Sequence, residues 1–257
     1  MLDVVLKTTC CIFDVLYRFS IYAWHSRANG RPDTASERGN LMQITIREPG
    51  SALTHFIAMM LAVFASTPLL VKAGSTADRT CFAAMWIFMA SMIALYGASA
   101  LYHSINVKDS ILKVFRKIDH MMIFVLIAGS YTPVCLIVLG GRLGYVLLTV
   151  VWTIAIIGMT IKALWITCPK WFSSIIYIAM GWVCLGVFGQ LWDTLPHSAF
   201  LWLLAGGIIY TIGGVIYALK LPIFNNRHKN FGSHEIFHLF VMGGSICHFI
   251  FMYLYVA

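Results

Sequence analysis

Three histidines occur where long apolar runs of the sequence begin or end, and imidazole is the side chain that most often binds transition metals. His234 and His238 stand four residues apart, which places both imidazoles on one face of a helix. His103 lies at the end of another apolar run. Three neutral imidazoles with a fourth position left open form a zinc site of the catalytic type. The alternative is that these histidines hydrogen-bond between helices or extend toward lipid head groups.

Asp119 and Ser99 are candidate catalytic groups beside such a metal. A carboxylate near a zinc-bound water can orient this water and accept its proton. The alternative for Asp119 is an ion pair with Arg116 or Lys117, or a favourable position in the first turn of its helix. Ser99 lies one turn before His103, where its hydroxyl can stabilise an oxyanion. The alternative for Ser99 is a hydrogen bond to its own helix.

Glu48, Ser51 and His55 lie at the start of the first apolar segment and share one helical face. We predict that they contact the metal ligands rather than the metal itself. For Glu48, which precedes Pro49, a helix-capping role is the alternative.

Two other histidines are predicted to stay outside the metal site. His120 points about 100° away from Asp119 on a helix, so the two side chains do not easily face one metal. His248 lies about 15 Å beyond His238 by helical rise, and we interpret it as a hydrogen-bonding residue between helices.

Long apolar helices must position these residues. The chain is 60% hydrophobic and only 11% charged, whereas a soluble domain has about a quarter charged residues. A bilayer core of about 30 Å needs roughly 20 apolar residues in a helix. Seven segments meet this requirement, at approximately 52–71, 82–105, 119–139, 143–161, 173–192, 198–219 and 236–256. The connections between them are short apart from 106–118 and 220–235. We therefore predict an all-α, multi-pass protein of the cell membrane.

The distribution of basic residues predicts the orientation. Fifteen of the 18 Lys and Arg residues lie in the N-terminal tail and in the loops after the second, fourth and sixth segments. The positive-inside rule then places the N-terminus in the cytoplasm and the C-terminus outside. In this topology the polar candidates fall at one cytoplasmic level, namely Glu48, His55, Ser99, His103, Asp119, His120, His234 and His238.

The first 47 residues differ from the rest of the chain. Charged residues recur along one stripe of residues 1–25, which favours an amphipathic helix on the inner leaflet. Residues 26–47 are typical of a polar linker. The predicted organisation is therefore a cytoplasmic region over 1–47 and a transmembrane domain over 48–257.

Charge and cysteine content exclude two other classes. The net charge of +8 is divided between apolar spans and forms no continuous basic patch, which argues against a nucleic-acid partner. The seven cysteines include no CxxC pair and lie mostly in apolar spans. We therefore interpret them as small buried residues rather than as a disulfide framework or a thiolate zinc site.

Several motifs in this order resemble the haemolysin III family, the bacterial branch of the progestin and adiponectin receptor group, which is similar in turn to the alkaline ceramidases. The resemblance extends over residues 48–256. The motifs are Glu48-Pro-Gly-Ser51-Ala-Leu-Thr-His55, Ser99-Ala-Leu-Tyr-His103, Asp119-His120, Gly129-Ser-Tyr-Thr-Pro133, Ala179-Met-Gly-Trp182, His234-Glu-Ile-Phe-His238 and Gly243-Gly-Ser-Ile-Cys-His248.

This resemblance implies a zinc ion held by His103, His234 and His238, with Asp119 associated with the zinc-bound water and Ser99 beside the site. Where the family is enzymatic, the implied activity is lipid amide hydrolysis of the ceramidase kind. A role in membrane homeostasis and a haemolysin name are also associated with bacterial members. The first 47 residues lie outside the resemblance.

We therefore predict a zinc-dependent hydrolase of a lipid amide or ester that acts from the inner leaflet, with membrane lipids and a lipid substrate or ligand as partners. The first alternative is a non-enzymatic sensor or receptor of membrane homeostasis with a structural zinc. The second is a pore-forming haemolysin, which is disfavoured because such proteins must first be soluble. The sequence does not indicate an oligomeric state.

Overall fold

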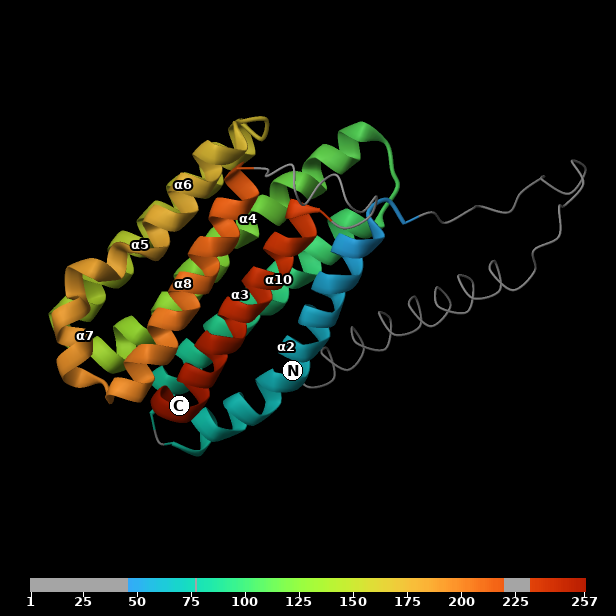
Figure 1. The fold of residues 1–257 in the computed structure, drawn as a ribbon. Helices are drawn as coiled ribbons and strands as arrows, with labels where there is room; N and C mark the ends of the chain where they lie inside the picture. The colour runs from blue at the N-terminus through green and yellow to red at the C-terminus, as the bar shows by residue number, and fades with distance from the viewer. Residues whose placement is uncertain (1–45, 77, 220–231) are drawn as a thin grey trace, which may run out of the picture. The chain divides into compact units, whose positions relative to one another are not determined.

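The computed structural model describes residues 46–76, 78–219 and 232–257. These ranges contain seven helical spans that are long and apolar enough to cross a membrane, which confirms the predicted fold class. The spans are α2 (Pro49–Ser75), α3 (Arg79–Ser104), α4 (Asp109–Pro133) with the π-helical turn η1 (Val134–Leu139), α5 (Gly141–Leu164), α6 (Lys170–Gly181) with η2 (Val183–Val187) and α7 (Phe188–Thr194), α8 (His197–Leu219), and α10 (Ser233–Phe251) with η3 (Met252–Val256) (Figure 1). The predicted interfacial helix and nearly all of the linker lie outside the described residues.

The apolar composition of these spans dictates helices, because a backbone in lipid must satisfy its own hydrogen bonds. Local signals set the helix starts. Pro49 occupies the first turn of α2, where its missing N–H is not needed. Asp78 caps α3 by accepting a hydrogen bond from the backbone N–H of Thr80 at 2.8 Å.

The span that carries Asp119 begins earlier than hydropathy predicts. The predicted loop over 106–118 is mostly helical, because α4 starts at Asp109. Lys113, Arg116 and Lys117 lower the hydropathy of these first turns without preventing a helix. Asp119 therefore lies inside a continuous helix, which fixes its direction more firmly than a position at a helix start would.

The fifth span is broken in the middle, where the 3₁₀ turn η2 separates α6 from α7. The hydroxyl of Tyr131 on α4 enters this break. It donates a hydrogen bond to the carbonyl of Gly181 at 2.6 Å and accepts one from the N–H of Cys184 at 3.0 Å. A side chain from another helix thus satisfies backbone groups that the break leaves without helical partners.

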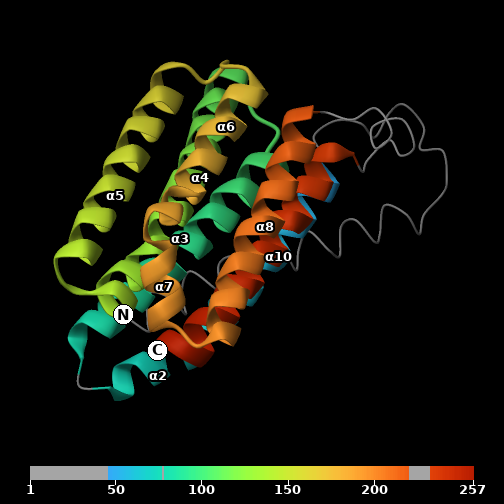
Figure 2. The same cartoon turned by 60° about the vertical axis from the view of Figure 1, so that its left-hand side comes forward.

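Each span packs against the next one in the sequence, and the last helix, α10, packs against the first, α2 (Figures 1 and 2). The spans of α3 and α4 are the most buried, with half of each apolar window covered. Glycines bring α8 and α10 together, as their sequence pattern predicts. A Cβ atom on Gly213 would lie 2.6 Å from Cβ of Phe240, and one on Gly244 would lie 2.8 Å from the ring of Tyr210.

Candidate metal centre

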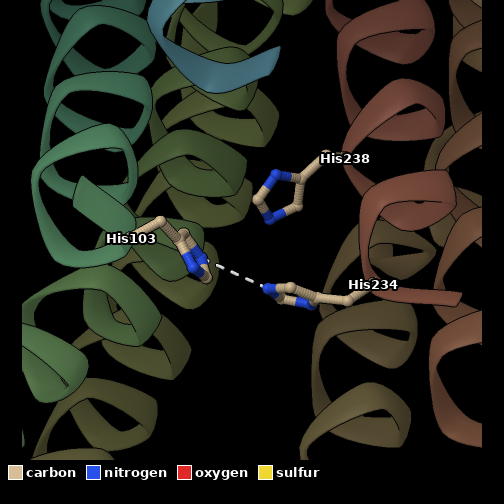
Figure 3. A group of neighbouring side chains, drawn as sticks. All are labelled: His103, His234 and His238. Atoms are coloured by element: carbon tan, nitrogen blue, oxygen red, sulfur yellow. Dashed lines mark hydrogen bonds between the residues drawn. The ribbon is translucent and has the colours of Figure 1, made fainter. Parts of the chain in front are cut away.

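The three predicted ligands come together at one end of the bundle. His103 lies in the last turn of α3, and His234 and His238 lie at the start of α10. One ring nitrogen from each lies within 4.8 Å of the others. Figure 3 shows the rings facing a common space between the two helices, with Nε2 of His103 and Nε2 of His234 separated by 3.2 Å. His103 and His238 are only 1% and 2% exposed.

Glu48 holds the ring of His103 from behind. Its Oε2 lies 2.5 Å from Nδ1 of His103, and its backbone N–H donates to the carbonyl of His103 at 3.1 Å. The hydrogen bond with His103 lowers the pKa of Glu48 to about 2, against partial burial, which raises it. Arg47 lowers it further from 3.2 Å away. The carboxylate is thus ionised at neutral pH and accepts the Nδ1 proton, which leaves Nε2 of His103 with a free lone pair.

The predicted capping alternative for Glu48 is not observed, because its side chain makes no cap hydrogen bond to α2.

Thr54 orients His238 in the same manner. The Thr54 hydroxyl lies 3.0 Å from each of the carbonyls of Gly50 and Ser51, so its proton is already used. Its oxygen then accepts the Nδ1 proton of His238 at 3.2 Å. This tautomer also leaves Nε2 of His238 with a free lone pair. Thr54 was not predicted as a site residue, although it lies within the Glu48–His55 motif.

These contacts test whether the residues fit a metal ion. Two tetrahedral zinc ligands with bonds of about 2.0–2.1 Å lie about 3.3 Å apart, close to the 3.2 Å between His103 and His234. Two ring nitrogens at this distance must share either a proton or a cation. Nδ1 of His234 has no hydrogen-bond partner among the described residues. The donor set, three imidazoles with two tautomers fixed from outside, fits a divalent transition metal.

Ser51 and His55 support α10 rather than His103. The Ser51 hydroxyl donates to Oε1 of Glu235 at 2.6 Å, and Oε2 of Glu235 accepts the N–H of Gly232 at 2.8 Å. This carboxylate therefore stabilises the first turn of α10, the helix that carries His234 and His238. Glu235 is a further site residue that was not predicted from the sequence. Its position one residue after His234 was the available signal.

His55 stacks on His238, with ring centroids 3.6 Å apart and planes 8° from parallel. Neither of its ring nitrogens has a hydrogen-bond partner within the described ranges. Glu48 and His55 thus contact imidazoles of the cluster directly, whereas the Ser51 hydroxyl binds Glu235 on α10.

An apolar cavity of about 140 Å³ opens beside the cluster and is bordered by α3, α4, α6, α8 and α10. Asp119 and Ser99 both line it, together with His234 and His238. The hydroxyl of Ser99 is buried and does not form the predicted bond to its own helix, but it lies close enough to Asp119 to stabilise the charge of that carboxylate. Both candidate catalytic groups therefore face the space next to the imidazoles.

The environment of Asp119 differs from the predicted alternatives. Lys117 donates to the carbonyl of Ala163 at 2.5 Å instead of pairing with Asp119. Nδ1 of His120 lies 3.0 Å from Oδ2 of Asp119 and 2.9 Å from the carbonyl of Arg116. His120 and Asp119 thus contact each other and both line the cavity, although their positions on the helix differ by about 100°. The group of possible metal ligands among the described residues does not include His120.

Comparisons with known proteins place these residues in context. The profile of the family described as haemolysin-III related matches residues 43–249. Hemolysin-3 of Bacillus cereus is 36% identical over 216 residues, which cover 84% of this chain and 94% of that protein. The Hemolysin-3 homolog of Bacillus subtilis is 36% identical over 80% of this chain and 92% of its own length. Progestin and adipoQ receptor-like protein 1 of Caenorhabditis elegans is 25% identical over 79% of this chain and 50% of its own length.

Proposed function

The chain belongs to the haemolysin III-related family, and from that premise we propose that it is a zinc-dependent hydrolase of a lipid amide or ester. It is a multi-pass protein of the cell membrane with relatives named as adiponectin receptor-like. The observation that carries the proposal is the convergence of His103, His234 and His238 beside an apolar cavity that Asp119 and Ser99 also line.

Zinc is the metal we propose, because three imidazoles with an open position are typical of catalytic zinc sites. His103, His234 and His238 would hold it. The chemistry that zinc supplies in such a site is Lewis-acid polarisation of a carbonyl group and acidification of water. Glu48 and Thr54 contribute by keeping the ligand nitrogens of His103 and His238 unprotonated.

Asp119 is the proposed general base. Its carboxylate is buried at the cavity wall, where it accepts the proton of the attacking water. His120 holds this carboxylate through Oδ2. Ser99 lies beside Asp119 at the same wall, and we propose that its hydroxyl turns from this carboxylate to donate a hydrogen bond to the oxygen on which negative charge develops. The apolar remainder of the cavity accommodates the hydrocarbon part of a lipid and excludes bulk water.

The cluster lies where α3 ends and α2 and α10 begin, so it belongs to one end of the bundle. The basic-residue distribution assigns that end to the cytoplasmic side. We therefore propose that the substrate enters from the inner leaflet.

The test is release of fatty acid from a ceramide and from a diacyl ester by purified protein in lipid nanodiscs, measured by mass spectrometry. We expect Asp119→Asn to keep its zinc and to lose turnover by about a hundredfold or more, because general-base catalysis contributes about 10²–10⁴-fold. Asp193→Asn is the matched control, since Asp193 is exposed on α7. Equal fatty-acid release by wild type and Asp119→Asn would refute the proposed role.

A second candidate function is a sensor or receptor with a structural metal. It is supported by the fact that the cluster connects α3 to α10, two helices remote in sequence. Metal binding there would couple the packing of both helices. Removal of zinc would then change thermal stability and ligand affinity, while no lipid product would form under any condition.

A further inference from the structure

The cavity beside the histidine cluster adjoins a second cavity of about 60 Å³. The second cavity is bordered by α4 with η1, by α5, by the broken fifth span, and by α8 and α10. The residues that line both cavities form the junction between them, and they are Ser130, Tyr131, Gly181, Trp182, Gly207 and His248. Because His234 and His238 line only the first cavity, the junction separates the cluster from the second cavity.

The space between the fifth span and α8 is widest at the break in that span. Nearer the cluster the two helices pack closely, since a Cβ atom on Gly214 would lie 3.2 Å from Cδ1 of Ile178. About two turns earlier on α8, a Cβ atom on Gly207 would meet nothing within 4 Å. A Cβ atom on Gly181, where α6 ends before η2, would also meet nothing within 4 Å. Glycines from both elements therefore leave the junction open.

Gly207 belongs to the face of α8 that lines the cavities. Residues on one helical face recur every three or four positions. The cavity-lining residues of α8 follow this spacing, and they include Leu203, Gly207, Tyr210, Thr211, Gly214 and Tyr217. The adjacent Gly206 lies instead against His248 of α10. A side chain at position 207 would therefore extend into the junction rather than into a neighbouring helix.

The polar side chains of the junction are already bonded within the chain. Tyr131 bridges the break, Trp182 donates its indole N–H to Thr211 at 2.8 Å, and Ser130 donates to a carbonyl of its own helix. Nε2 of His248 lies 3.3 Å from a carbonyl of α8, which is the predicted bond between helices, and its Nδ1 is buried. Among the described residues, those that line the second cavity include no Lys, Arg, Asp or Glu. Such a lining fits hydrocarbon rather than a polar head group.

We propose that the hydrocarbon chain of the bound lipid crosses the junction into the second cavity, and that Gly207 sets the chain length that the protein accepts. This rests on the proposed function, in which the carbonyl end of the lipid lies at the cluster. The ring centroid of Tyr217 lies 5.6 Å from that of His234, so Tyr217 marks the level of the cluster on α8.

The distance along α8 gives the chain length that reaches the junction. Gly207 lies about 15 Å from Tyr217 by helical rise. An extended chain advances about 1.2 Å per bond, so a chain of about twelve carbons ends near Gly207. The chains of hexadecanoic and octadecanoic acid must therefore pass it, whereas the chain of decanoic acid ends before it.

The experiment measures a series of saturated fatty acids from decanoic to octadecanoic acid. Their affinities for purified protein in nanodiscs are obtained by displacement of a fluorescent fatty acid, and each is divided by the wild-type value so that partitioning into lipid cancels. We expect Gly207→Leu to bind octadecanoic acid about tenfold more weakly, because excess volume in a filled space is unfavourable. Decanoic acid should bind as it does to wild type.

Gly189→Leu is the matched control. Gly189 lies on α7, lines neither cavity, and a Cβ atom there would also meet nothing within 4 Å. This variant should bind every acid of the series as wild type does.

A second measurement uses wild-type protein alone. Hexadecanoic acid with a diazirine at the end of its chain is photolysed in the complex, and the cross-linked residues are identified by mass spectrometry. We expect cross-links to residues that line only the second cavity, such as Leu191, Phe200 and Leu203. Decanoic acid with the same label should react with residues of the first cavity, such as Ile123 and Leu126.

The outcomes separate this proposal from the proposed function. If Gly207→Leu binds all chain lengths as wild type does, or weakens them all equally, Gly207 does not set the chain length. Cross-links of the long acid to the first cavity alone would also refute the proposal, even if Gly207→Leu does not fold. Neither result would contradict hydrolysis at the cluster. If no acid displaces the probe from wild type, the lipid site itself is refuted and the proposed function fails with it.

Discussion

Two buried polar clusters join α3 to α10, and they differ in whether they are complete. The hydroxyl cluster of Tyr96, Tyr210 and Ser245 forms a closed chain in which both tyrosine hydroxyls pair with the serine oxygen. In the histidine cluster the outer nitrogens of His103 and His238 are paired, while one ring nitrogen of each histidine faces the common centre.

This difference distinguishes a structural network from a binding site. Buried polar groups are costly unless they are satisfied, and the hydroxyl cluster meets that requirement from within the chain. In the histidine cluster only Nδ1 of His103 and Nδ1 of His238 are paired with other side chains. The ring nitrogens that face one another at its centre therefore need a shared proton or a cation. A perturbation that removes metal should therefore affect the histidine cluster and leave the hydroxyl cluster intact. The following predictions test that separation.

The largest effect is expected from His103→Ala. This change removes one of three ligands and the only one that α3 contributes. We expect the zinc content of purified protein to fall from about one ion per chain to near zero, because two imidazoles do not make a tetrahedral site. The measurement is inductively coupled plasma mass spectrometry on protein purified without added metal.

The matched comparison is His197→Ala, which removes an exposed imidazole. It should keep full zinc content. Wild-type zinc content in His103→Ala would show that the metal binds elsewhere, and the proposed distinction between the two clusters would be lost.

A smaller effect is expected from Glu48→Gln, which keeps the shape of the side chain but removes the charge that holds Nδ1 of His103. Loss of such a partner typically weakens metal binding by about 10–100-fold. The measurement is competition with a zinc chelator of known affinity. Asp193→Asn is the control, because Asp193 is exposed on α7 and is not among the residues of the cluster. Equal weakening in both variants would mean that the effect is general loosening of the fold.

The smallest effect is expected from Tyr96→Phe, which opens the hydroxyl cluster at one end. Ser245 keeps its contact with Tyr210, so the free energy of unfolding should fall by only about 1 kcal/mol. Zinc content should not change. The measurements are thermal unfolding in detergent and metal analysis of the same sample. Loss of zinc in this variant would contradict the separation between the two clusters.

The sequence predicted the spans and the common level of the histidines because these depend on local composition. Apolar runs fix seven helices, and the alternation of their direction puts His103 and His234 at the same end. The start of α4 at Asp109 was missed, because charged residues lowered the hydropathy of helical turns.

Contacts between distant segments were harder to predict. Glu48 was placed near the site, but its bond to His103 depends on how α2 packs on α3. The break before Cys184 depends on Tyr131 of another helix.

Cysteine chemistry provides a further example of this limit. Cys168 was interpreted as a buried apolar residue, whereas its sulfur lies 3.0 Å from the ammonium group of Lys162, which also contacts Ser173. Neither the spacing nor the local composition of these residues indicates that they meet. Such contacts arise from tertiary packing, which cannot be predicted from the pattern of a single sequence.

The proposed catalysis depends on one zinc ion bound by His103, His234 and His238. X-ray absorption at the zinc edge of protein in nanodiscs tests it most directly, because it reports the ligand atoms. We expect a shell of nitrogen and oxygen at about 2.0–2.1 Å, with imidazole scattering from three rings. A sulfur shell at about 2.3 Å, or protein that carries no zinc when purified in its presence, would contradict it.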